Sequence, residues 1–126
     1  MPLPGELDLT RPAVAAAVLM SLAALGGLAL FAIRIVRGSN PPRVLVMGHG
    51  ALVLLGFAAL VFGLIHGERP GLVGLGALLF FLVAVAGLWL AWRHRRGLLV
   101  PVPMIAIHGA AGLVAVAFYW FLLLET

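Results

Sequence analysis

Residues 44–66 read VLVMGHGALVLLGFAALVFGLIH, and residues 103–124 read PMIAIHGAAGLVAVAFYWFLLL. Each stretch is apolar over the roughly 20 residues that a helix needs to cross about 30 Å of hydrocarbon. Two further stretches, 12–36 and 71–92, have the same character. The sequence therefore predicts an all-α fold, an integral membrane four-helix up-down bundle, formed by a single transmembrane domain over residues 1–126.

The composition of the whole chain supports this class. Of 126 residues, 64% are hydrophobic and 10% are charged, and the mean hydropathy is +1.23. A soluble domain of this size exposes much of its surface and could not bury so many apolar side chains. We interpret residues 12–36 as a permanent span rather than a cleaved signal peptide, because the segment before it carries Glu6 and Asp8 and the apolar run is about twice as long as that of a signal peptide.

The charged residues separate the two ends of the bundle. Six of the eight basic residues, all arginines, fall in the first and third connections, which an up-down bundle places together: Arg34, Arg37, Arg43, Arg93, Arg95 and Arg96. The acids fall at the other end. Because cytoplasmic loops are rich in basic residues, we expect the arginine-rich end to face the cytoplasm of a bacterial inner membrane and both termini to be periplasmic. Anionic lipid headgroups then account for the net charge of +4, and no nucleic acid is expected as a partner.

The two halves of the chain resemble each other. A shift of 59 positions lays His49-Gly50-Ala51 on His108-Gly109-Ala110, and Arg34 on Arg93. Each half would be a helical hairpin of the same orientation. The sequence predicts two tandem hairpins related by a pseudo-two-fold axis along the membrane normal.

His49 and His108 are the only basic or acidic side chains deep in the spans. Each lies roughly 8 Å along its helix from the arginine-rich end. The second and fourth helices are diagonal in an up-down bundle, so both imidazoles can project onto the central axis at one depth. Ionisable side chains within a membrane are candidates for function.

Small residues beside the histidines suggest what the pair could hold. Gly56 shares a face with His49, and Gly112 with His108, and both would leave room for a flat macrocycle. A haem iron takes two axial imidazoles, so we predict one haem b with both histidines as metal ligands. Three arginines near the arginine-rich end would bind its propionates through charge-assisted hydrogen bonds: Arg43, Arg93 and Arg96.

Plainer interpretations remain open for the same residues. Small residues allow close helix packing in any membrane protein, and a histidine near the interface can simply hydrogen-bond a carbonyl of another helix. Polar and aromatic side chains at the span ends are interpreted as interfacial residues: His66, His94, Trp89, Trp92, Tyr119 and Trp120.

One histidine on the second helix and one on the fourth, with glycines nearby, resembles the four-helix haem-binding core of b-type membrane cytochromes. The resemblance implies electron transfer within or beside a respiratory or photosynthetic complex, with a quinone or a redox subunit of a larger membrane complex as partner. Such cytochromes commonly hold a second haem four turns further along the same helices. The corresponding positions here are Phe62 and Gly63 on one helix and Phe121 and Leu122 on the other, which cannot bind iron.

An autonomous enzyme is not expected. The spans contain no carboxylate, and neither serine has a histidine and a carboxylate near it in the sequence. The chain has no cysteine, which excludes thiolate metal sites, iron–sulfur clusters and covalently attached haem. The alternative to a haem protein is a cofactor-free accessory or assembly subunit of a larger membrane complex.

Overall fold

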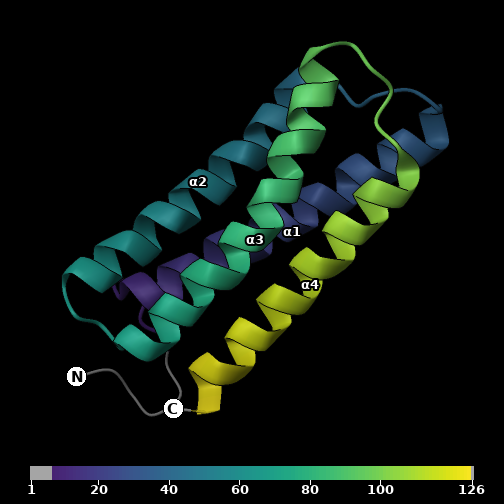
Figure 1. Ribbon diagram of the computed structural model, residues 1–126. Coiled ribbons are helices and arrows are strands. Elements are labelled where there is room, and N and C mark those ends of the chain that lie inside the picture. Colours follow the sequence, from purple (N-terminus) through teal and green to yellow (C-terminus); the bar gives the residue numbers. More distant parts are fainter. Residues whose placement is uncertain (1–6, 126) are drawn as a thin grey trace.

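The computed structural model describes residues 7–125, which form four helices: α1 (Pro12–Arg37), α2 (Arg43–Ile65), α3 (Pro70–Arg95) and α4 (Val102–Glu125). In Figure 1 the α1–α2 and α3–α4 connections lie at one end of the bundle, and both chain ends lie at the other. All four helices are long and apolar enough to cross a membrane. The prediction of an all-α, four-helix membrane bundle is confirmed.

The helix ends lie close to the predicted positions, with the largest difference at α3. This helix runs to Arg95, three residues beyond the expected end, because a charged segment can stay helical after it leaves the apolar layer. It stops at Gly97, whose φ of 71° favours glycine. There the amides of Gly97 and Leu98 turn back to the carbonyls of His94 and Arg93, at 3.0 and 3.1 Å.

The helices form a ring. α1 and α3 each pack against both α2 and α4, and the contact between α1 and α2 is the most extensive. α2 and α4 therefore lie across the diagonal, as an up-down bundle requires. The outer faces carry large exposed side chains such as Leu54, Phe62, Leu88 and Phe121, which suit contact with lipid.

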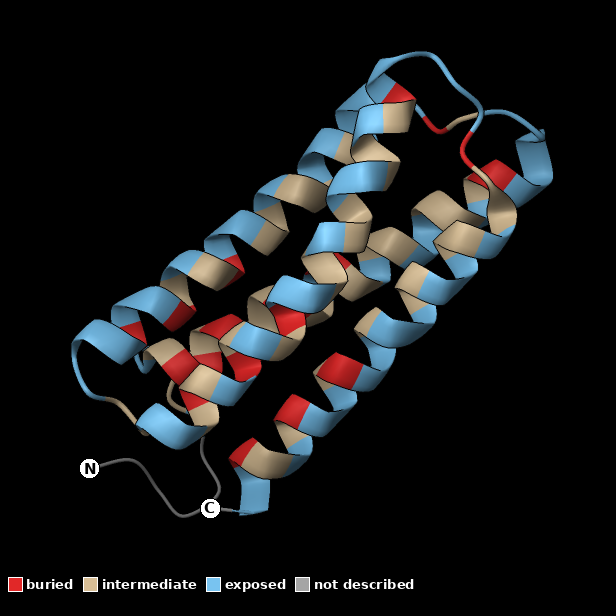
Figure 2. Cartoon of the chain, viewed as in Figure 1, coloured by how far each residue is buried: buried red, intermediate tan, exposed pale blue. Residues whose placement is uncertain are grey.

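The apolar core lies in the half of the bundle that contains the chain ends, as the red segments of Figure 2 show. There the small residues of α1 allow the other helices to approach closely. The cluster consists of Ala13, Val14, Ala16, Ala17, Met20, Leu60, Val73, Phe80, Ala115, Tyr119 and Leu123.

Tyr119 belongs to this core and not to an interfacial belt. Its side chain is 1% exposed, and its hydroxyl donates a hydrogen bond of 3.0 Å to the carbonyl of Ala13. The ring lies on Gly76, where a Cβ atom would come within 2.6 Å of it. The interfacial interpretation was wrong for Tyr119, because the space above Gly76 and the carbonyl on α1 together accept the whole side chain.

At the arginine-rich end, polar side chains fasten the two connections to each other. Arg34 of α1 donates from Nε to the carbonyl of Val100, at 3.2 Å, in the α3–α4 connection. His94 of α3 donates from Nε2 to the carbonyl of Pro41, at 2.7 Å, in the α1–α2 connection. Asn40 bridges the connections through hydrogen bonds to the backbone of Leu98 and Val100.

His94 was predicted to be an ordinary interfacial residue, and this interpretation was wrong. Its side chain is 7% exposed and takes part in the hydrogen bonds that join the two connections. Each hairpin therefore places one buried side chain, Arg34 or His94, against the connection of the other hairpin. This pattern supports the predicted pairing of two similar hairpins.

Candidate functional site

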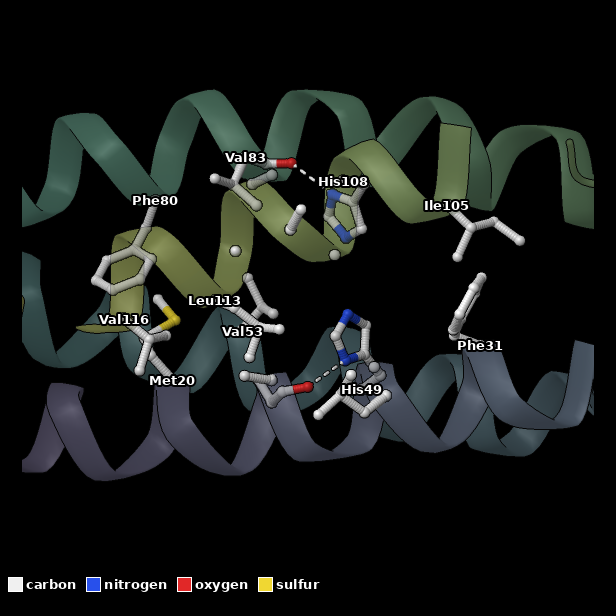
Figure 3. A pocket seen from close by; sticks show the side chains of 18 of the residues that line it. Met20, Phe31, His49, Val53, Phe80, Val83, Ile105, His108, Leu113 and Val116 are labelled. Atoms are coloured by element: carbon white, nitrogen blue, oxygen red, sulfur yellow. Dashed lines mark hydrogen bonds between the residues drawn. The ribbon is translucent and has the colours of Figure 1, made fainter. Parts of the chain in front are cut away.

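His49 of α2 and His108 of α4 face each other across the bundle. Their ring centroids are 6.4 Å apart, and the ring planes are inclined by 85°. Figure 3 shows His49 beside the α1–α2 hairpin and His108 beside the α3–α4 hairpin, with the space between the hairpins separating the rings. The structure therefore brings the two predicted ligands together from diagonal helices.

Each imidazole is held by a backbone carbonyl of the preceding helix. Nδ1 of His49 donates to the carbonyl of Ala23 at 2.8 Å, and Nδ1 of His108 donates to the carbonyl of Val83 at 3.1 Å. A carbonyl oxygen can only accept, so in each neutral ring the hydrogen is on Nδ1 and the lone pair is on Nε2. Metal-binding histidines are commonly oriented by a hydrogen bond of this kind.

The two Nε2 atoms point toward each other in Figure 3. Neither makes a hydrogen bond to any residue of the described range 7–125. The Nδ1 bonds satisfy the purely structural interpretation of these histidines. The paired Nε2 lone pairs are the feature that this interpretation leaves unexplained.

Two glycines allow the rings to lie close to the neighbouring helices. A Cβ atom on Gly27 of α1 would come within 3.2 Å of Cε1 of His49, and one on Gly87 of α3 within 2.9 Å of Cε1 of His108. Neither glycine was in the predicted site. Glycine inside a helix is unfavourable without a packing reason, and that signal could have drawn attention to both positions.

The histidine contacts also refine the internal repeat. The residue that donates and the residue that accepts are 26 positions apart in the first hairpin and 25 in the second. The accepting residues Ala23 and Val83 are therefore 60 positions apart, whereas the histidines are 59 positions apart. Because Gly27 and Gly87 are also 60 positions apart, aligning the two halves at a shift of 59 does not show that these glycines occupy equivalent positions.

Of the two glycines predicted to line the site, the structure places one there. Gly112 lines the cavity beside the histidines. Gly56 lies against Met20, whose Cε would be 2.8 Å from an added Cβ atom, and it does not line the cavity. Gly56 serves packing between α1 and α2, because the methionine side chain fills the space that the glycine leaves.

The cavity next to the two rings has a volume of about 300 Å³ and reaches the molecular surface. Most of its lining comes from α1 and α4, and the lining is apolar apart from the histidines. Figure 3 shows Phe31 and Ile105 toward one end of the cavity and Phe80, Met20 and Val116 toward the other. An apolar cleft with a few convergent polar atoms is typical of ligand sites.

The predicted propionate ligands lie outside this cavity. Arg43 donates to the carbonyl of Arg95 at 3.4 Å, and Arg96 stacks on the ring of Trp92. Arg93 donates from Nη2 to the carbonyl of Leu99 at 3.1 Å, while its buried Nε has no partner within residues 7–125. Arg34, which was not among the predicted propionate ligands, is only 8% exposed.

The histidines offer two ligands and no more. The part of the chain from residue 7 to residue 125 contains no group of three or more side chains suited to holding a metal ion. A protein-bound zinc ion usually takes three or four protein ligands. Two opposed imidazoles instead suit a metal whose remaining ligands come from a macrocycle.

Comparison with known proteins adds no relative: no protein-family model, no curated protein and no solved structure matches the chain. The fold and the site define a multi-pass membrane protein with a pair of inward-facing histidines.

Proposed function

We propose that the chain is a small membrane b-type haem protein that holds one haem b between His49 and His108 and transfers electrons. The separation of the two rings carries the proposal. A metal–imidazole bond is about 2 Å long, and the nitrogen lies roughly 1 Å from the ring centre, so imidazoles on opposite sides of one iron have centroids about 6 Å apart. The observed separation of 6.4 Å agrees with this value.

A macrocycle in this position would lie across the line that joins the two Nε2 atoms. One of its faces would meet α1 and α2, and the other α3 and α4, as the arrangement in Figure 3 implies. The cavity of about 300 Å³ is at the lower end of ligand sites and smaller than a whole porphyrin. The remainder of the ring would extend through the opening of the cavity, most of whose lining belongs to α1 and α4.

The residues of the chain would set the chemistry of the bound group. Haem would supply a one-electron redox centre, and His49 and His108 would hold its iron and leave no position open for substrate, which suits electron transfer. The hydrogen bonds from Nδ1 to the carbonyls of Ala23 and Val83 would fix the ring orientation and leave Nε2 of each ring free to bind the iron. The apolar lining excludes water from the site.

The same proposal includes a location and a partner. The arginine-rich end would face the cytoplasm of a bacterial inner membrane, and both termini would be periplasmic, because basic residues favour the cytoplasmic side. A single haem close to one face cannot carry an electron across the whole bilayer alone. A quinone or a redox subunit of a larger membrane complex would exchange electrons with it.

Absorption spectroscopy of the purified protein tests the proposal. The wild type, supplied with haem, is expected to show the Soret and reduced bands of low-spin, six-coordinate haem. His49→Ala and His108→Ala should each abolish this spectrum, and imidazole added to a folded alanine variant should restore it. His66→Ala, at the opposite end of α2, is the control and should leave the spectrum unchanged.

Two results would contradict the proposal. One is the absence of a Soret band after haem has been supplied to the folded protein. The other is a low-spin spectrum that survives both histidine substitutions.

The angle between the rings provides a further test of the same site. Each imidazole would raise the energy of one of the two iron d orbitals of π symmetry, so ring planes inclined by 85° would act on different orbitals and leave the two nearly equal in energy. The ferric protein is then expected to give a strongly anisotropic electron paramagnetic resonance signal with a large maximal g value. A rhombic signal, typical of parallel imidazoles, would show that the rings rotate when iron binds.

The alternative is a cofactor-free accessory subunit, and one observation favours it. The Nδ1 bonds of His49 and His108 link α2 to α1 and α4 to α3, so they stabilise each hairpin without any ligand. In that case the histidine substitutions would lower the melting temperature of a colourless protein by the same amount whether or not haem is supplied.

A further inference from the structure

Two guanidinium groups at the arginine-rich end contact the same short segment of backbone. Arg34 donates to the carbonyl of Val100, and Arg93 donates to the neighbouring carbonyl of Leu99. Arg34 is 8% exposed, and Nε of Arg93 is buried. Two positive charges on different helices thus contact adjacent backbone carbonyls. One belongs to a buried side chain, and the other belongs to a half-buried side chain that also lies over the ring of Trp89.

No carboxylate of residues 7–125 accompanies this pair. The described acids are Asp8, Glu68 and Glu125, at the opposite end of the helices (Figure 1). Within the same range, Nε of Arg93 has no hydrogen-bond partner, and the Nη groups of Arg34 make no hydrogen bond. A buried charge without an opposite charge or full hydrogen bonding is costly, so this pair is suited to an anionic partner.

Neither arginine lines the cavity, but both lie on the arginine-rich side of the histidines, within reach of a ligand that extends beyond it. Arg34 follows Gly27, on which His49 rests, by seven residues, or about 10 Å along α1. Arg93 follows Gly87, on which His108 rests, by six residues, or about 9 Å along α3. Helical side chains lean toward the helix N-terminus, and for both helices that direction leads back toward the histidines.

Arg34 also shares a helix face with the cavity. Phe31, which lines the cavity, precedes it by three residues and so lies on the same side of α1. The exposed arginines of this end, Arg37, Arg43, Arg95 and Arg96, can reach lipid phosphates from outside. Arg34 is covered by the α3–α4 connection and faces the interior.

We propose that Arg34 and Arg93 form a receptor for the two carboxylates of the ligand that His49 and His108 hold. The inference rests on the proposed haem function and identifies the propionate end of the ligand. Of the three arginines predicted to bind the propionates, this proposal keeps Arg93, and it replaces Arg43 and Arg96 with Arg34. It also sets the orientation of the macrocycle, with its propionates toward the arginine-rich end.

The test compares ferric protoporphyrin IX with its dimethyl ester, which keeps the iron but has no free carboxylate. Both are titrated into the detergent-solubilised apoprotein, and partition into empty micelles is measured and subtracted. The wild type should bind the free acid about tenfold more tightly or better, because hydrogen bonds between charged groups are strong. Both compounds should give the histidine-dependent low-spin spectrum.

Single substitutions locate the effect. Arg34→Gln and Arg93→Gln should each reduce the preference for the free acid, and should leave the affinity for the ester nearly unchanged. Arg37→Gln removes the same charge from an exposed position of α1 and should keep the wild-type preference.

The outcomes separate this inference from the function on which it rests. Equal affinity of the wild type for the two compounds, both with low-spin spectra, overturns the carboxylate receptor and leaves the haem proposal standing. A preference that survives Arg34→Gln and Arg93→Gln also overturns it. If neither compound gives a low-spin spectrum, both proposals fail. The wild-type comparison can refute the receptor without any variant, and Arg93→Gln still locates the effect if Arg34→Gln does not fold.

Discussion

The two halves of the bundle use the same packing device with different results. In the half with the chain ends, the Tyr119 ring fills the space above Gly76, and the Met20 side chain fills the space at Gly56. In the arginine-rich half, the rings of His49 and His108 fill the space at Gly27 and Gly87. A glycine therefore admits a large side chain from another helix in both halves.

What differs is the chemistry of the side chain that fills the space. Tyr119 and Met20 join a continuous apolar core, and the one hydroxyl there is satisfied by the carbonyl of Ala13. The imidazoles each use one nitrogen for a carbonyl and leave the other facing a cavity. One half of this small bundle is a filled apolar core, while the other contains a cavity and two free Nε2 lone pairs, on which the proposed ligand site depends.

The largest effect is expected from Gly87→Ala. The new methyl group would come within 2.9 Å of Cε1 of His108, so the ring must move away from α3 and from the Val83 carbonyl that holds it. Haem affinity should fall about tenfold or more, since a metal site tolerates only small misplacements of its ligands. Titration of the apoprotein with haem measures this.

Gly74→Ala is the matched control on α3, because its nearest contact would be an ordinary one at 3.9 Å. Unchanged haem affinity in Gly87→Ala would show that the close fit of His108 does not matter for binding. The two halves would then differ less than we infer.

A second prediction concerns the half with the chain ends. Gly76→Ala would place a methyl group 2.6 Å from the Tyr119 ring and should destabilise the bundle by roughly 1–3 kcal/mol, as overpacked cores do. Thermal unfolding in detergent measures this. The low-spin spectrum of the haem-loaded protein should stay the same below the unfolding transition, and a changed spectrum would show that the halves are coupled.

Tyr119→Phe tests the same half more gently. The ring remains, but the carbonyl of Ala13 loses its hydrogen bond from the hydroxyl group. The loss should cost about 1 kcal/mol of unfolding free energy. Leu124→Ala, at an exposed position of the same helix, serves as the control for general effects on α4. A cost equal to that of the control would refute the contribution of this hydrogen bond.

The smallest effect is expected at the surface. Arg11 and Glu68 form an ion pair of 3.2 Å, and the Arg11 side chain is 46% exposed. Arg11→Gln should therefore lower the unfolding free energy by less than about 1 kcal/mol. Glu68→Ala should cost more, because the carboxylate also accepts the backbone amide of Ala13 at the start of α1. A larger loss of stability for Arg11→Gln than for Glu68→Ala in thermal unfolding would contradict this interpretation of the half with the chain ends.

The four spans, their connections and the matched histidines followed from local features of the sequence. Apolar length reports a membrane helix without reference to its neighbours, because every span meets the same hydrocarbon layer. The depth of His49 and His108 follows from counting along helices of known rise. Their diagonal arrangement needed only short connections and an even number of spans.

The contacts between helices could not be obtained in this way. A membrane helix is apolar all round, so its sequence does not state which face meets which neighbour. The roles of Tyr119, His94, Arg34 and Gly56 all depend on the rotation of a helix about its own axis. Each was misassigned or left out for that reason.

The chain alone thus sets the membrane class, the number of crossings and the presence of two histidines at equal depth, since each depends on hydrophobicity and distance along one helix. Only the tertiary structure decides that the imidazoles turn their Nε2 atoms toward each other, that Gly27 and Gly87 support them, and that Arg34 is buried. Those features depend on side chains from different helices filling one another's space, which is a property of the packed bundle.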